Sequence, residues 1–464
     1  MFKKTLLASI VFFAICTQIS IAQQLLTLDE CRQLAIENNK SLKAASEQER
    51  VAYYQKREAF MNFFPKLSAS GTYMHLSKDI HLIGKSSIPS ELSLTIPGLG
   101  PINIPVDPKI QGALYNAGKI SLSDIWMGGF TLTQPIFAGG KIVAYNDLRA
   151  YAEELAKTMN ETKASDIIVE VDEGYWQVVS LVNKQKLAKS YLDVISQMSS
   201  DINELEKEGL ATKADKLNVN VRLNEAEMTL TRANNGVSLA KMALAQLCGL
   251  EISDNITLAD ENIESLPDAS AYDLTINQEE AISNRSEIRS LSLATQIYKK
   301  QEAIARSEFL PTAGIAVGYN WMNPNGADGL KYEFGGMWNV AVQVKVPLNF
   351  ISSSAKLKAA KAQTRIKQFE LEEAREKIKL QITQSNYKLA EANKKLKSAQ
   401  KNCETADENL RYANAGFEEG VISALDAMQA HTAWIAAHAD LIDAQIDVKL
   451  CRLYLDKALG RKLK

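Results

Sequence analysis

Residues 355–415 contain neither glycine nor proline, and this run constrains the fold more than any other part of the chain. Glycine and proline are the residues that most disfavour the interior of a helix, so the run predicts one continuous helix. With its flanks it covers about 65 residues, which at 1.5 Å per residue gives roughly 100 Å. Because ordinary globular domains have no core of that length, the sequence predicts an extended helical structure.

Two long helical runs end in the same short motif, Glu-Gly-x-x-Thr/Ser-x-x-Asp, at 208–215 and 419–426. Glycine takes the positive φ that ends one helix. A Thr or Ser followed three residues later by Asp forms a capping box that begins the next helix. We therefore predict a helical hairpin turn at each motif, and we name them the first tip (208–215) and the second tip (419–426).

The return helices after the tips share one pattern of large and small apolar residues, spaced alternately by three and four. The first series is Leu223, Ala226, Leu230, Ala233, Val237, Ala240, Leu244 and Leu247, and the second, 211 residues later, is Trp434, Ala437, Leu441, Ala444, Val448, Cys451, Leu455 and Ala458. Such a seam suits closely packed antiparallel helices, and an ordinary two-helix coiled coil is the alternative. The repetition indicates an internal duplication.

The segments before the hairpins are duplicated too. Helical patterns at 28–63 and 274–309 superpose when shifted by 246 residues. Each is followed by two segments of alternating apolar and polar residues, which is typical of strands with two different faces, and in the first repeat a long loop separates them. The predicted strands are about 66–78 and 119–137 in the first repeat, and about 312–323 and 336–350 in the second. The prolines interpreted as helix–strand junctions are Pro65, Pro135, Pro311 and Pro347.

These patterns divide the chain into four parts. Residues 1–22 have the charged start, short apolar run and small final residues of a signal peptide. A membrane anchor is the alternative, but the apolar run is too short to span a bilayer. The remaining parts are the first repeat at 23–249 with its hairpin at 141–249, a linker at 250–273, and the second repeat at 274–460 with its hairpin at 355–460.

Composition and motifs exclude several function classes. The net charge of −2, from 53 basic and 55 acidic residues, argues against nucleic acid as a partner. No phosphate-binding loop or hydrolase motif is present, so we expect no enzyme activity. His431 and His438 lie seven residues apart without a third ligand, so we expect no metal or cofactor. The cysteines of the mature chain are interpreted as small core residues, with a disulfide as the alternative: Cys31, Cys248, Cys403 and Cys451.

Four strands per chain are too few to close a barrel, since about eight is the minimum. A sheet with open edges invites further pairing, and oligomerisation supplies it. Three chains give twelve strands, together with enough long helical segments to form a tube. Counting therefore predicts an oligomeric β-barrel joined to a helical tube, with three as the smallest number of chains that leaves a pore.

The order helix, strand, strand, helical hairpin, twice over, resembles the outer membrane efflux protein family, the TolC-like channel-tunnels, across about 24–462. The motifs that carry the resemblance are Leu28-x6-Ala35 with Asn38, Phe64-Pro65, Leu310-Pro311, Gln134-Pro135-Ile136-Phe137-x-Gly139-Gly140 and the doubled tip motif. It implies a membrane α+β fold class and a homotrimer of the outer membrane with a large periplasmic portion. In that trimer the antiparallel helical hairpins form a trimeric α-barrel, and four strands from each chain share a twelve-stranded transmembrane β-barrel. The resemblance further implies the exit duct of a tripartite efflux or type I secretion system, bound to a periplasmic membrane-fusion adaptor and an RND or ABC pump, for small molecules or proteins.

The resemblance also assigns roles to the tips. Asp215 and Asp426 would line a periplasmic aperture as rings of carboxylates. Asp426 could equally serve only to cap its helix, and capping is the preferred interpretation of Asp215. Some family members lock the aperture with an Arg and a Tyr, where this chain has Ile422 and Phe417, so apolar contacts are expected to replace the polar lock. The residues expected to dock the adaptor are Gly209, Leu210, Thr212, Gly420, Val421 and Ser423.

Two other functions compete with the duct. A periplasmic coiled-coil scaffold or adaptor is the principal alternative, but adaptors normally carry a single hairpin and lack the doubled strands. A passive porin is disfavoured because porins use nearly all of their length in strands of about ten residues.

Overall fold

The computed structural model describes residues 24–77, 80–81, 84–97, 100–120, 124–262, 278–325 and 331–461. The predicted signal peptide and the later part of the predicted linker lie outside the described residues. The chain forms two compact units. The helical unit comprises Met1–Tyr54, Ala150–Ile297 and Thr364–Lys464, and the strand unit comprises Gln55–Arg149 and Tyr298–Gln363. Each unit therefore takes segments from both predicted repeats.

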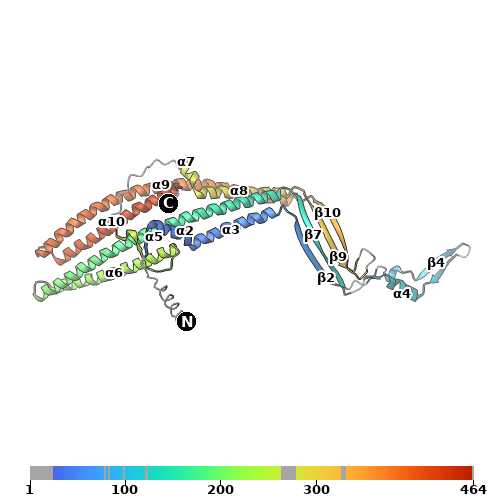
Figure 1. Cartoon of the computed structure of the whole chain (residues 1–464), viewed down its shortest axis with the longest axis horizontal. Coiled ribbons are helices and arrows are strands. Elements are labelled where there is room, and N and C mark those ends of the chain that lie inside the picture. Colours follow the sequence, from blue (N-terminus) through green and yellow to red (C-terminus); the bar gives the residue numbers. More distant parts are fainter. Residues whose placement is uncertain are drawn as a thin grey trace, which may run out of the picture. The chain divides into compact units, whose positions relative to one another are not determined.

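Two long helical hairpins dominate the helical unit (Figure 1). The first joins α5 (Lys141–Lys207) to α6 (Lys213–Leu247), and the second joins α9 (Phe350–Glu418) to α10 (Ala424–Ala458). No described helix is both long enough and apolar enough to cross a membrane.

The helices that precede the hairpins are broken where the sequence predicts continuity. The first is split into α2 (Leu28–Asn38) and α3 (Lys40–Met61), and the second into α7 (Gln278–Asn284) and α8 (Ser286–Ser307). At the first break the buried Asn39 donates to Leu247 O at 3.0 Å and accepts from Ser41 N at 2.9 Å. This side chain ends one helix, begins the next and reaches the end of α6, a tertiary contact that the helical periodicity does not reveal.

The two repeats also close in the same way. Gly249 and Gly460 follow α6 and α10 with φ of +71° and +66°. A Cβ on Gly249 would lie 2.6 Å from Asn38 Cβ, and a Cβ on Gly460 would lie 3.1 Å from Asn284 C. Only glycine adopts this backbone conformation readily while allowing such a close approach, so each return helix ends tightly against the short helix of its own repeat.

Sequence reasoning missed a small parallel pair in the helical unit. Strand β1 (Gln24–Leu26) pairs with β8 (Ile256–Leu258), which is followed by a 3-10 turn at Ala259–Asn262. The predicted linker is therefore partly structured. It is held to α6 by a Lys241–Glu261 ion pair at 2.9 Å, in which both side chains are largely buried.

The strand unit contains one four-stranded antiparallel sheet in the order β10-β9-β7-β2. Its strands are β2 (Lys66–His75), β7 (Asp124–Ala138), β9 (Thr312–Asn323) and β10 (Gly335–Lys345). The two repeats meet at the β7–β9 ladder. The outer strands are β2 and β10, and among the residues that the structure describes neither pairs with a further strand.

Three predictions about this unit are wrong. The last strand ends at Lys345 rather than 350, and α9 begins at Phe350 rather than 355. Pro347 lies between the two elements, because proline cannot donate to the ladder. The second strand of the first repeat, β7, begins at Asp124 rather than 119. The long loop before it contains β3 (Ile80–His81), a 3-10 turn (Lys85–Ser87), β4 (Glu91–Ile96), β5 (Gly100–Pro105), α4 (Pro108–Ala117) and β6 (Lys119–Ile120).

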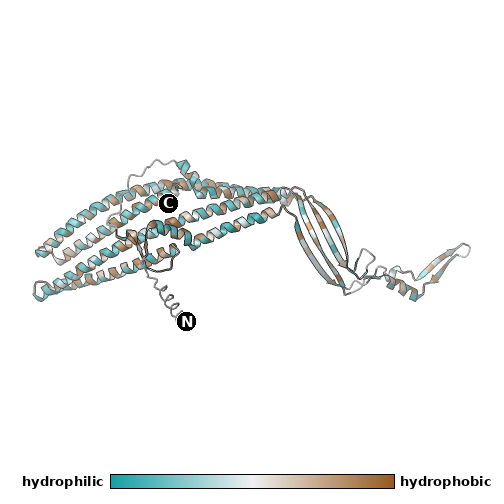
Figure 2. Cartoon of the chain, viewed as in Figure 1, coloured by the Kyte–Doolittle hydropathy of each residue, from teal (hydrophilic) through white to brown (hydrophobic). Residues whose placement is uncertain are grey.

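The four-stranded sheet has one apolar and one polar face, and Figure 2 shows the alternation along its strands. Register places Tyr73 beside Trp126 and Phe130 beside Tyr319, which in turn faces Trp338. Exposed apolar residues on this face are Leu67, Tyr73, Trp126, Phe130, Leu132, Val317, Tyr319, Trp338, Val340, Val342 and Val344. The opposite face carries Ser68, Ser70, Thr72, Thr131, Asn320, Asn339 and Gln343, together with exposed methionines near one end of the sheet, Met74, Met127, Met322 and Met337.

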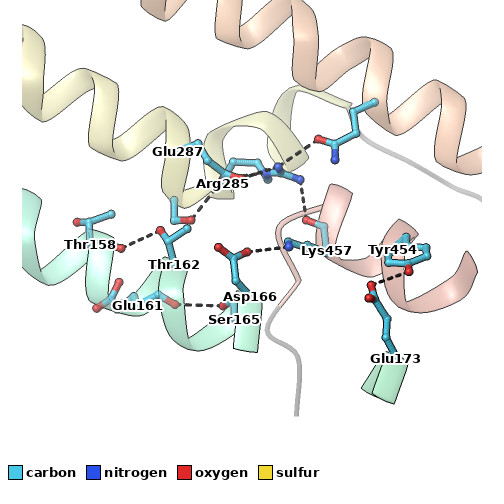
Figure 3. A network of polar contacts seen from close by, with 12 residues as sticks. Thr158, Glu161, Thr162, Ser165, Asp166, Glu173, Arg285, Glu287, Tyr454 and Lys457 are labelled. Atoms are coloured by element: carbon cyan, nitrogen blue, oxygen red, sulfur yellow. Dashed lines mark hydrogen bonds and ion pairs between the residues drawn. The ribbon is translucent and has the colours of Figure 1, made fainter. Parts of the chain in front are cut away.

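Within the helical unit, charged and polar contacts connect the two hairpins (Figure 3). Lys457 on α10 contacts Asp166 on α5 at 2.7 Å, and Tyr454 donates to Glu173 at 2.6 Å. The buried Arg285 donates to Lys457 O at 2.8 Å, which ties the break between α7 and α8 to the end of α10. The return helix of one repeat is thereby fixed to the first helix of the other.

Arg32 on α2 makes a two-pronged contact with Asp172 on α5, at 2.7 and 2.5 Å. The Asp172 side chain is only 4% exposed. Hydrogen bonding to this carboxylate raises the pKa of Arg32 above its ordinary value.

Arg32→Met should destabilise the packing of α2 on α5 by about 3 kcal/mol, because it leaves a buried carboxylate without its cation. Arg50→Met is the matched control, since its partner Glu47 is 65% exposed and water screens that pair. Amide hydrogen exchange across α2 in the purified protein measures both effects. Equal protection in the two variants would contradict the prediction.

Candidate functional site

The first tip has the geometry that its motif predicts. Gly209 has φ of +82°, and Leu210 N donates to Leu205 O at 2.8 Å, which closes the end of α5. Thr212 and Asp215 form the full capping box: Asp215 N donates to the Thr212 hydroxyl at 3.2 Å, and Thr212 N donates to the Asp215 carboxylate at 3.0 Å. The Thr212 hydroxyl also donates to the Asp215 carboxylate at 2.6 Å. This hydroxyl, as the largest cause, and the Thr212 N–H together hold the pKa of Asp215 below its ordinary value.

The second tip repeats the turn but differs in its cap. Gly420 has φ of +71°, and Val421 N donates to Gly416 O at 2.8 Å. Asp426 N donates to the Ser423 hydroxyl at 3.2 Å, and this hydroxyl donates to the Asp426 carboxylate at 2.7 Å. Asp426 is exposed, whereas Asp215 is half-buried. The second carboxylate is therefore the one more open to solvent.

The apolar residues expected at the aperture lie within contacts of the chain itself. Phe417 packs against a cluster that includes Ile195, Ile202 and Met428, where the two hairpins meet. Ile422 covers Gly416 so closely that a Cβ there would lie 2.6 Å from Ile422 Cδ1. Both side chains are half-buried. In one chain they close the second tip and join it to the first hairpin.

The first tip uses an ion pair at the place that Phe417 occupies in the second. Glu206, 211 residues before Phe417, contacts Lys216 at 3.3 Å, and both side chains are about one-third exposed. This pair was missed by sequence reasoning, although the internal alignment of the repeats points to it.

The residues expected to dock a partner all lie at the surface of the two tips. Gly209, Thr212, Gly420 and Ser423 are exposed. Leu210 and Val421, which occupy equivalent positions, are 73% and 82% exposed. Each tip thus presents one uncovered apolar side chain at its apex.

Three of the four prolines interpreted as junctions lie between a helix and a strand, but Pro135 does not. Pro65, Pro311 and Pro347 precede β2, β9 and α9. Pro135 lies inside β7 opposite Gly314, where the register shifts, and the strand continues to Ala138. The junction interpretation of Pro135 is wrong, because a bulge accommodates its missing N–H inside the ladder.

The four cysteines are free thiols in this structure, and Cys31, Cys248 and Cys403 are buried. Cys248 lies against Cys31, with its Sγ 3.6 Å from Cys31 O. His431 is also buried and contacts Asn414 at 3.0 Å, and burial lowers its pKa. His438, seven residues later on α10, does not share this contact and lies against a different set of residues on α9.

An uncovered apolar sheet face combined with long helical hairpins defines the architecture of an outer-membrane channel protein. The chain belongs to the outer membrane efflux protein family, whose model matches residues 31–250 and 278–461. It is 21% identical over 347 residues to the outer membrane protein TolC of Vibrio cholerae, covering 73% of this chain and 77% of that protein.

Solved structures share the fold. The CmeC outer membrane channel of Campylobacter jejuni aligns with a TM-score of 0.75 at 14% identity, covering 93% of this chain and 85% of that one. The outer membrane protein VceC of Vibrio cholerae aligns with a TM-score of 0.71 at 16% identity, covering 94% and 97%. The family and the fold are those of outer-membrane efflux channels.

Thr212→Val should raise the pKa of Asp215 part of the way to its ordinary value of about 3.9, because the backbone N–H donor remains while the hydroxyl donor is lost. Since folding lowers this pKa, the stabilisation by Asp215 is present above the unfolded pKa. This stabilisation is lost as the pH falls through the folded pKa. Because the pKa shift is smaller in Thr212→Val, the stabilisation by Asp215 is smaller in that variant.

Selective isotope labelling of Asp and a pH titration by NMR measure this shift. Thr229→Val is the control, since that hydroxyl donates to Glu225 O within α6. A pKa of Asp215 that is the same in Thr212→Val as in the wild type would contradict the assignment of the cap.

Proposed function

We propose that three copies of this chain form the outer-membrane exit duct of a tripartite efflux or type I secretion system. The observation that carries the proposal is the exposed apolar face of the four-stranded sheet, with two outer strands, β2 and β10, available for pairing. A lone sheet of this kind is unstable in water, but lipid covers the face and neighbouring copies extend the ladder.

The dimensions of the sheet support this proposal. Strands β9 and β10 have 12 and 11 residues. At about 3.3 Å per residue and the tilt of about 40° usual for barrels, they span roughly the 25 Å of an apolar membrane band. Three copies supply twelve strands whose polar face lines a lumen.

The helical unit supports the same assembly. Apolar side chains remain exposed on α6 and α9, where a single chain leaves them uncovered: Leu217, Val221, Met228, Leu239, Ile366, Phe369, Leu380, Tyr387 and Tyr412. Adjacent copies of the hairpins would cover them and close the helices into a tube. In this assembly the six tips of a trimer lie at the periplasmic end. There Leu210 and Val421 would contact a membrane-fusion adaptor, which connects the duct to an RND or ABC pump.

A periplasmic scaffold without a channel is the alternative, and the sheet distinguishes the two. Val340→Arg puts a charge in the middle of the apolar face and should cost about 2–4 kcal/mol of insertion. Asn339→Arg, one residue earlier on the polar face, should be tolerated. We expect wild type and Asn339→Arg in the outer-membrane fraction as heat-sensitive trimers, and little Val340→Arg there. Recovery of the wild type as a soluble periplasmic protein would refute the duct.

At the aperture we propose that Asp426 provides a carboxylate ring, whereas Asp215 acts as a cap. Three copies of an exposed carboxylate attract cations and repel anions. Asp426→Asn should therefore reduce the preference for K⁺ over Cl⁻ in planar bilayers.

The matched variant Asp215→Asn should leave that preference close to wild type while loosening the first turn of α6. Reversal potentials in a salt gradient measure both variants. An unchanged preference in Asp426→Asn would contradict the aperture role and leave the duct itself untouched.

A further inference from the structure

Three side chains with metal-binding atoms converge on the second hairpin, away from both tips. Cys403 and Asp407 lie one turn apart on α9, and His438 reaches them from α10. The thiol, one carboxylate oxygen and one imidazole nitrogen lie within 4.8 Å of one another. In the sequence, His438 follows His431 by seven residues and no third ligand is evident. The other two members of the cluster, Asp407 and Cys403, lie 31 and 35 residues before His438, on the opposing helix.

Asp407 is the centre of the cluster. Its Oδ1 accepts from His438 Nε2 at 2.9 Å and from Trp434 Nε1 at 2.6 Å. The Trp434 and His438 rings also pack together, with centroids 4.2 Å apart. The indole therefore orients both the carboxylate and the imidazole, as outer groups commonly do around metal ligands.

The positions of the side chains suit a site that an ion can enter. Cys403 is 5% exposed, so its thiol forms the inner wall. The Asp407 side chain is 52% exposed and that of His438 is 27% exposed, which leaves one side open to solvent. An ordinary ion pair accounts for Asp407 and His438, and the seam accounts for a small residue at 403. Neither the ion pair nor the seam explains why the Cys403 thiol lies close to both the Asp407 carboxylate and the His438 imidazole.

We propose that Cys403, Asp407 and His438 bind one Zn²⁺ ion per chain. Thiolate, carboxylate and imidazole are the ligand types of protein zinc sites, and ligands at 2.0–2.3 Å from the ion lie about 3.5 Å apart. Binding would require side-chain rotations that bring the ligand atoms, now within 4.8 Å of one another, to that separation. The Cys403 proton is released to solvent on binding, and a water molecule takes the fourth position. The ion would clamp α9 to α10 about 20 Å from the second tip, given 1.5 Å per residue.

The test uses the full mature protein in detergent, stripped of metal with a chelator. Zn²⁺ titration by calorimetry should show one site per chain. Cys403→Ser and His438→Gln should abolish that site, and Trp434→Phe should weaken it about tenfold, because its indole only orients the ligands. Cys451→Ser and His431→Gln are the controls. Both residues lie on α10, and both variants should bind Zn²⁺ as the wild type does.

Co²⁺ provides a second readout that reports the ligand directly. The wild type should show a near-ultraviolet thiolate-to-metal absorption band, which Cys403→Ser removes and Cys451→Ser retains. Circular dichroism checks that each variant is folded. Absence of a one-to-one site in the wild type, or equal binding in Cys403→Ser and Cys451→Ser, would overturn the proposal.

Discussion

An apolar sheet face that none of the described residues covers is the constraint on which the structure depends. Strands β2, β7, β9 and β10 place their aromatic and branched side chains on one side and their small polar ones on the other. Exposure of that apolar face to water is unfavourable. The two outer strands also leave backbone N–H donors and C=O acceptors that need hydrogen-bond partners. A lipid bilayer and further copies of the sheet resolve both problems together, so the strand unit by itself argues for an oligomer in a membrane.

The helical unit depends on tertiary contacts that are repeated in both halves. Gly249 and Gly460 allow the ends of α6 and α10 to approach the short helices of their repeats, and Asn39 and Arg285 hold the breaks that follow those helices. Arg32 with Asp172 then fixes α2 to α5. Long helices gain little stability from propensity alone, so these buried polar contacts, together with the apolar seam, determine how the hairpins pack.

Local rules made the tips predictable from sequence, because a glycine with positive φ and a Thr or Ser cap act within a few residues. The end of β10 and the start of α9 differ from the prediction, since alternation continues past Lys345 although no ladder does. The break at Asn39 and the β1–β8 pair depend on segments more than 200 residues away. The packing of Phe417 against the apolar cluster between the hairpins could not be predicted from the sequence either, because it depends on where the two hairpins meet.

Native mass spectrometry of the protein extracted from the outer membrane in mild detergent tests the central claim most directly. Closing the sheet through β2 and β10 of neighbouring copies predicts a single complex of three chains that persists until the barrel is unfolded. Conditions that keep the strands intact should yield no folded monomer. A folded monomer as the stable species, or a complex with a number of chains other than three, would contradict the account.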